Sequence, residues 1–83
     1  MEHYLIIARS ITYAQRMQRA LGKAGIRCRI FRAPRDLTSL GCAYAVELAP
    51  PDLTAALQIL RREHLDRVQI FLPQAGGIQE VVP

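Results

Sequence analysis

Tryptophan is absent from this 83-residue sequence, and cysteine occurs only twice, as Cys28 and Cys42. No apolar run approaches the roughly 20 residues that a membrane-spanning helix needs. The apolar stretch at residues 4–8 is too short for the core of a signal peptide, and no small-residue cleavage site follows it. These absences predict a single cytoplasmic domain without membrane contact, in which the cysteines remain free thiols.

Motifs for catalysis or metal binding are missing as well. The two histidines, His3 and His64, and the two cysteines are possible metal ligands, but no two of them have the short spacing of zinc-binding pairs. The sequence contains no glycine-rich phosphate loop, no helical pair of carboxylates and no recognisable nucleophile with its base. We therefore expect a protein that is not an enzyme and that holds no metal or cofactor.

Acidic residues are scarce in the first part of the chain. Residues 1–35 contain eight arginines and lysines and a single acidic residue, whereas residues 36–83 contain three arginines and six acidic residues. This asymmetry suggests a basic surface for nucleic acid, for an acidic protein or for an anionic small molecule. The alternative is a solvated surface whose arginines only keep a small protein soluble.

Hydrophobic periodicity predicts the order strand, helix, strand, strand, helix, strand. Ser10 is a good N-cap for the first helix, and Gly25 a good terminator. The expected strands cover residues 3–8, 26–32, 43–48 and 68–72, and the expected helices 11–24 and 51–64, with a loop at 33–41. With right-handed crossovers this order predicts a ferredoxin-like α+β sandwich in residues 1–72, with two helices on one face of a four-stranded antiparallel sheet. Residues 73–83 are expected to form a flexible tail.

The two cysteines occupy different positions in this pattern. Cys28 alternates with isoleucines in the second strand, which favours a small core residue. Cys42 follows Gly41 at a junction of loop and strand, where glycine would let a reactive group approach and where Arg32 and Arg35 would stabilise a thiolate. Cys42 also shares the parity of the apolar residues of the third strand, so a packing role stays open. Because the predicted hairpin separates the two thiols by several residues, we expect no disulfide between them.

The most specific residues of the sequence lie at the start of the first helix, in the loop and at the start of the third strand: Ser10, Thr12, Tyr13, Pro34, Arg35, Gly41, Cys42 and Tyr44. With these residues the chain resembles a family of small bacterial domains, the selenium/sulfur carrier-like proteins. The resemblance covers about residues 4–72. At residue 43 the chain has alanine where the family commonly has a second glycine.

The resemblance implies that Cys42 accepts a persulfide or a selenyl sulfide. A donor protein such as a cysteine desulfurase would supply the sulfur or selenium, and an acceptor protein would receive it. Pro34, Arg35, Gly41 and Tyr44 would then form the supporting loop. Basic side chains would steer an acidic partner to the carrier, and we assign this role to Arg16, Arg19, Lys23 and Arg32.

A non-catalytic interaction or regulatory module is the alternative. The sheet face without helices would then pair two copies of the chain through a flat patch at Ala43 and Ala45, or the basic surface would bind anions or RNA weakly. Sequence-specific RNA recognition is disfavoured, because that face is expected to present one aromatic residue, Phe71, whereas base stacking uses several.

Overall fold

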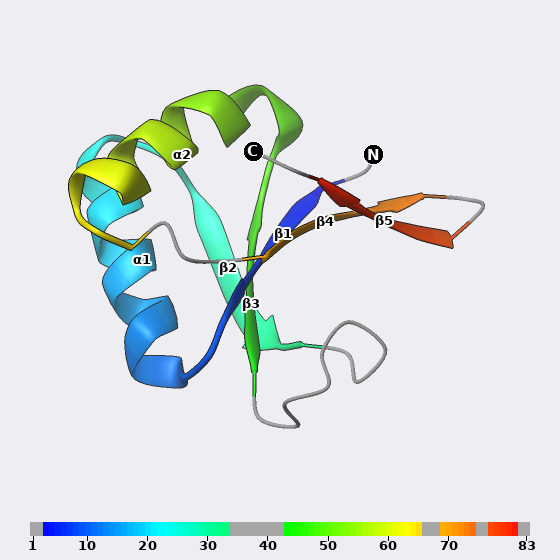
Figure 1. Ribbon diagram of the computed structural model, residues 1–83. Coiled ribbons are helices and arrows are strands. Elements are labelled where there is room, and N and C mark those ends of the chain that lie inside the picture. The colour runs from blue at the N-terminus through cyan, green and yellow to red at the C-terminus, as the bar shows by residue number, and fades with distance from the viewer. Residues whose placement is uncertain (1–2, 34–42, 66–68, 75–76, 82–83) are drawn as a thin grey trace.

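The computed structural model describes residues 3–33, 43–65, 69–74 and 77–81. Figure 1 shows the helices on one side of a single twisted sheet. The elements in chain order are β1 (Tyr4–Ala8), α1 (Ile11–Lys23), β2 (Cys28–Arg32), β3 (Tyr44–Leu48), a short 3₁₀ helix η2 (Pro50–Asp52), α2 (Leu53–Arg62), β4 (Gln69–Gln74) and β5 (Gly77–Val81). No helix in these ranges is long and apolar enough to cross a membrane.

The sheet has the strand order β2-β3-β1-β4-β5, and every neighbouring pair is antiparallel. Its first four strands have the order and direction of a ferredoxin-like fold, with β1 between β3 and β4. The predicted α+β class and the predicted succession of strands and helices are therefore confirmed.

The C-terminal residues differ from the expected irregular tail. β4 continues to Gln74, and β5 pairs with it from Ile70↔Val81 to Gln74↔Gly77. Glycine and proline usually interrupt strands, but only two residues separate Gln74 from Gly77, which is the length of a tight hairpin connection. Pro73 lies beyond the part of β4 that pairs with β1, so its missing N–H costs that ladder nothing.

The main core lies between the helices and one face of the sheet. Ser10 caps α1 as predicted, since its Oγ accepts a hydrogen bond from the Tyr13 N–H at 3.1 Å. Fully buried side chains from both layers meet here, among them Ile6, Met17, Leu21, Val46, Leu60 and Ile70. This burial fixes which sides of α1 and α2 remain free to meet other molecules.

Both helices end in the same hydrogen-bonded turn. After α1, Gly25 has a φ of 82°, and the Ile26 N–H donates to the Leu21 carbonyl at 3.0 Å. After α2, His64 has a φ of 60°, and the Leu65 N–H donates to the Leu60 carbonyl at 2.7 Å. These are Schellman motifs, in which glycine is the usual residue at the left-handed position. Glycine occupies that position after α1, and histidine occupies it after α2.

The other face of the sheet has its own apolar cluster. Leu5, Ile7, Ala33, Ala43 and Ala45 are buried there, and two aromatic side chains, Phe31 and Phe71, pack against them. The prediction that Ala43 and Ala45 form an exposed patch is therefore wrong, because they are only 2% and 0% exposed. The register explains the burial of Ala45, since this small residue lies between the larger Ile7 on β1 and Phe31 on β2.

Candidate functional site

Four of the predicted site residues lie outside the described residues: Pro34, Arg35, Gly41 and Cys42. The strands on either side of residues 34–42 are described. Ala33 and Ala43 directly flank this segment in the sequence, and the Ala33 N–H donates a hydrogen bond to the Ala43 carbonyl at 2.9 Å. Both ends of the segment are therefore anchored at one end of the β2–β3 hairpin.

Tyr44 and Arg32 form a cross-strand pair at this end of the sheet. The register of β2 and β3 places Arg32 opposite Tyr44. Tyr44 also pairs with Ala8 of β1 on its other side. The Tyr44 side chain is half-buried and packs against the main core, whereas Arg32 is exposed. Arg32 thus places an exposed cation on β2, two strands away from β1.

The N-terminus of α1 lies at the same end of the sheet, because Ala8 is followed by Arg9 and then by the N-cap Ser10. Figure 1 shows α1 beginning beside the end of β2 and the start of β3. Arg9 is exposed, and its guanidinium lies 5.0 Å from the centre of the Tyr13 ring. A helix N-terminus carries a partial positive charge. This end of the sheet therefore gathers three positive contributions, from Arg9, Arg32 and α1.

Arg9 was not among the predicted site residues. Its closeness to the β2–β3 hairpin depends on the pairing of β1 with β3, which no local pattern in the sequence contains.

Cys28 lies at the opposite end of β2. It is partly buried and packs against the main core, in agreement with its predicted role. Burial raises the pKa of its thiol above the ordinary value of 9.0, because desolvation penalises the charged form. The neutral thiol is therefore favoured at physiological pH, and neutral thiols are poor nucleophiles.

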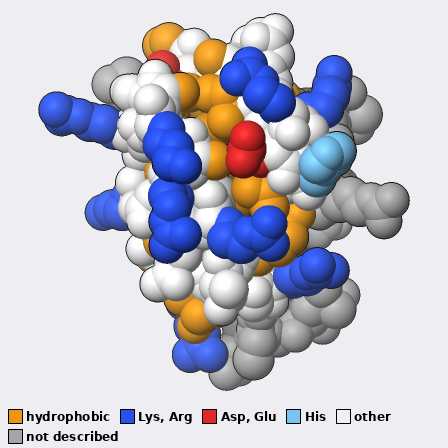
Figure 2. All heavy atoms as spheres, turned by 90° about the vertical axis from the view of Figure 1, so that its left-hand side faces the viewer, with side chains coloured by type: hydrophobic (Ala, Val, Ile, Leu, Met, Phe, Trp, Pro, Cys, Tyr) orange, Lys and Arg blue, Asp and Glu red, His pale blue; other side chains and the backbone are white. Residues whose placement is uncertain are grey.

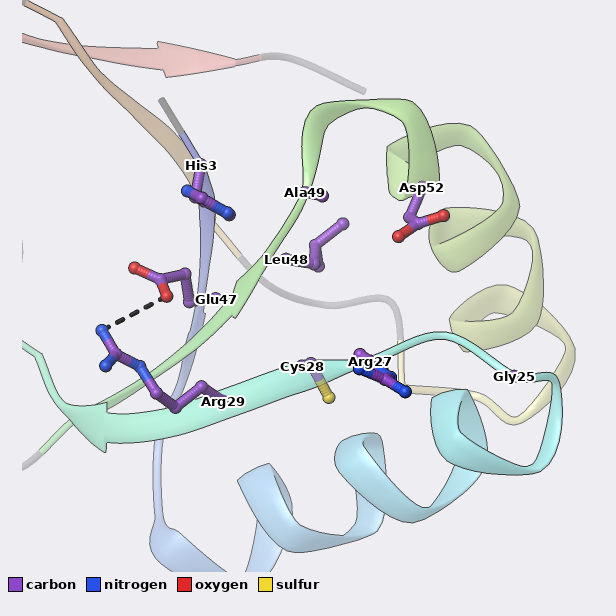
Figure 3. Close-up of a pocket in the computed structure, with 9 residues that line it drawn as sticks. All are labelled: His3, Gly25, Arg27, Cys28, Arg29, Glu47, Leu48, Ala49 and Asp52. Carbon is purple, nitrogen blue, oxygen red and sulfur yellow. Dashed lines mark ion pairs between the residues drawn. The ribbon is translucent and has the colours of Figure 1, made fainter. Parts of the chain in front are cut away.

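Figure 3 shows an open hollow of about 490 Å³ around the start of β2 and the end of β3. The Cys28 sulfur lies on the side of β2 that faces α1, whereas Arg29 extends on the other side toward Glu47. Arg29 and Glu47 are direct cross-strand neighbours, with 3.3 Å between Nη2 and Oε1. Because Arg29 is 73% exposed, this pair adds at most about 1 kcal/mol to stability.

Charges of both signs line this hollow, and they largely offset one another. The basic side chains are Arg27 and Arg29, and the acidic ones are Glu47 and Asp52. His3 lines the same hollow. Within the described ranges, no three His, Cys, Asp or Glu side chains are grouped as a metal site would require. Neither the charges nor the ligand types around Cys28 single out this hollow as a binding site.

The predicted docking residues fall into two places. Arg16, Arg19 and Lys23 are exposed on α1 and surround a shallow hollow of about 190 Å³ together with Ala20, Glu63 and Leu65. Figure 2, which looks at the helical side of the molecule, shows Lys and Arg side chains over much of this face and few acidic ones. Arg32 is not one of the residues around this hollow, because it lies at the end of β2 opposite Tyr44.

The fold defines a small α+β domain with one half-buried thiol, Cys28, and a second cysteine two residues before β3 in the sequence. A family model described as "Putative Se/S carrier protein-like" matches residues 3–72, which include both cysteines and extend from β1 into β4. The chain belongs to this family. No curated protein and no solved structure matches this chain.

Proposed function

We propose that this protein carries sulfur or selenium on Cys42, as a persulfide or a selenyl sulfide, and relays it between proteins without being an enzyme itself. Membership of the Se/S carrier-like family over residues 3–72 is the observation that carries this proposal. The state of the other thiol supports it, because burial disfavours the thiolate of Cys28. By elimination, Cys42 is the better candidate for sulfur chemistry.

The charges around the ends of the segment that contains Cys42 also support the proposal. Arg9, Arg32 and the N-terminus of α1 lie at the end of the sheet where Ala43 leads into β3. Cations and helix N-termini lower the pKa of a nearby thiol, because they stabilise the thiolate. A thiol carried at this end is thus placed in a favourable field for ionisation.

The proposed reaction is a sulfur exchange without net oxidation. The Cys42 thiolate attacks the terminal sulfur of a persulfide on the donor protein, such as a cysteine desulfurase. A new S–S bond forms on Cys42 while the S–S bond of the donor breaks. The donor cysteine leaves as a thiolate and takes up a proton from water. The same exchange with a terminal selenium atom gives a selenyl sulfide.

The experiment is to incubate the protein with a cysteine desulfurase and cysteine, and then to record its intact mass and map the modified residue. We expect the wild type and the matched control Cys28→Ser to gain the mass of one sulfur, and Cys42→Ser to gain none. Loading on Cys28, or no loading where known acceptors load, would contradict the proposal. Repeating the reaction with selenocysteine shows whether the protein also accepts selenium.

A non-catalytic interaction module remains the second candidate, favoured by the exposed basic residues of α1. Such a module binds its anionic partner through Arg16, Arg19 and Lys23 and needs no thiol chemistry. The Cys42→Ser variant distinguishes this module from a carrier. In an interaction module, this substitution changes neither the binding of the partner nor the fold. Sulfur loading that is lost in Cys42→Ser contradicts a role in binding alone.

A further inference from the structure

One face of α1 carries a row of basic side chains. Arg16, Arg19 and Lys23 are spaced by three and four residues, which aligns them along one side of a helix. All three are exposed, while the opposite side of the helix buries Ala14, Met17 and Leu21 in the core. Packing thus holds the basic row outward in a fixed orientation. We call these three residues together with Glu63 the α1 stripe.

The basic side chains of the α1 stripe make no ion pair within the described part of the molecule, where Arg29–Glu47 is the salt bridge that forms. Glu63, the C-cap of α2, lies across the same hollow from them and is not within ion-pair distance of any of the three. Lys23 and Glu63 also line an adjoining hollow of about 350 Å³, with Arg62 at its rim. Among the described residues this surface is therefore predominantly positive, with one carboxylate, Glu63, among the cations.

We propose that the α1 stripe is a docking surface for an acidic segment of a partner protein that also presents one basic side chain to Glu63. This inference rests on the proposed function for the role of the partner, which is then the protein that exchanges sulfur or selenium with Cys42. Binding to the stripe itself does not depend on that chemistry. Charge complementarity of this kind accelerates association and selects partners.

The carboxylate decides between a protein and a nucleic acid as the occupant. A nucleic acid presents only negative charge along its backbone, so Glu63, which lines the same hollow as the three cations, would repel it. Single-stranded nucleic acids additionally stack their bases on aromatic side chains, and none lines the two hollows at the stripe. A protein surface, in contrast, can place an acidic group against each cation and a basic group against Glu63.

The position of the α1 stripe on the helix suits a carrier. Arg16 is five residues from Ile11, where α1 begins, which corresponds to about 8 Å along the helix axis. The beginning of α1 lies at the end of the sheet where β3 starts. A partner bound along α1 therefore reaches toward the end of the sheet to which Cys42 is joined.

Nuclear magnetic resonance tests the docking surface directly. The probe is a short glutamate-rich peptide with one central lysine, added to the labelled full chain at low and high salt. We expect saturable shifts of the amides of the α1 stripe that fade as the salt concentration rises. Arg16→Glu with Arg19→Glu should weaken binding about tenfold, because each surface ion pair contributes a modest amount and two are reversed.

Two controls make the result specific. Arg27→Glu with Arg61→Glu changes the net charge equally at exposed positions outside the stripe, and it should weaken binding far less. Glu63→Gln should remove the preference for the lysine-containing peptide over an all-glutamate peptide. Equal losses in the two double variants, shifts centred elsewhere, or tighter binding of a single-stranded oligonucleotide to the stripe would each overturn the inference.

Failure of the docking surface is distinguishable from failure of the carrier role. If Cys42 loads with sulfur while the stripe ignores the peptide, the docking surface is wrong and the carrier role stands. If the stripe binds the peptide and Cys42 never loads, the docking surface stands as part of an interaction module.

Discussion

Desolvation distinguishes Cys28 from an ordinary surface thiol. Its side chain packs against the main core, and burial raises its pKa above 9.0. The folded state therefore holds this proton more tightly than the unfolded state does. Between the pKa of the Cys28 thiol in the unfolded state and its higher pKa in the folded state, the free energy of unfolding therefore falls as pH rises.

We predict that Cys28 reacts slowly with iodoacetamide at neutral pH and that its rate levels off only above pH 9, because alkylation requires the thiolate and burial raises the pKa of this thiol. The measurement follows the mass of the Cys42→Ser variant over a pH series. The same variant in urea is the control, and it should react like an unstructured thiol. Rapid alkylation of folded Cys28 at neutral pH would show that its surroundings do not suppress ionisation.

His64 adopts a backbone conformation that favours glycine, with a φ of 60°. We predict that His64→Gly raises the free energy of unfolding by about 0.5–1 kcal/mol, because the left-handed conformation costs glycine less than a residue with a Cβ. Urea denaturation followed by circular dichroism provides the measurement.

The first helix offers the converse control for this substitution. Gly25 holds the equivalent position after α1 with a φ of 82°, so Gly25→Ala should destabilise by about 1 kcal/mol. Gly22, inside the helix, has open space around it, and Gly22→Ala should not destabilise. If His64→Gly lowers stability, the His64 side chain makes a contribution that outweighs the backbone cost.

At the scale of elements, α1 serves three purposes at once. One side of the helix packs on the sheet, and another carries the basic row of the α1 stripe. Between them, the Gln18 Nε2 donates to the Cys28 carbonyl of β2 at 3.2 Å. Because β2 is an edge strand of the sheet, this hydrogen bond gives one of its carbonyls a partner from α1.

β5 is an addition to the four strands that the family model covers, because the match ends at residue 72. We predict that a chain ending at Gln74 still folds and still loads sulfur. The free energy of unfolding should fall by about 1–3 kcal/mol, because several backbone hydrogen bonds to β4 are lost. Circular dichroism, urea denaturation and the sulfur-loading experiment measure these outcomes, and an unfolded truncated chain would assign β5 an essential structural role.

At the scale of the whole molecule, local signals predicted the fold well. Ser10 and Gly25 delimit α1 nearly as expected, and alternation places Val46 and Leu48 on the core side of β3. Local signals failed where the outcome depends on register between strands. Ala45 is buried because Ile7 of β1 and Phe31 of β2 both lie opposite it, which depends on the register of three strands. β5 pairs with β4 although this part of the sequence contains glycine and proline.

The candidate site was predictable only in part. Cys42 was predicted as the site from its glycine neighbour and from the family resemblance, and it lies outside the described residues. The basic row on α1 followed from helical spacing alone. Glu63 was not recognised as its companion, because the two helices are distant in the sequence and meet only when both pack on the sheet.

The pairing of β1 also governs how this chain reaches its native state. β1 pairs with β3 and β4, which are both made later, and not with β2, which follows it in the sequence. β1, from the first half of the chain, thus lies between β3 and β4 of the second half. β3, in turn, lies between β2 and β1 of the first half. Ladders formed by residues so far apart in the sequence slow folding. Neither half has a complete sheet to nucleate on, so the domain must acquire its structure in one cooperative event after β4 has been synthesised.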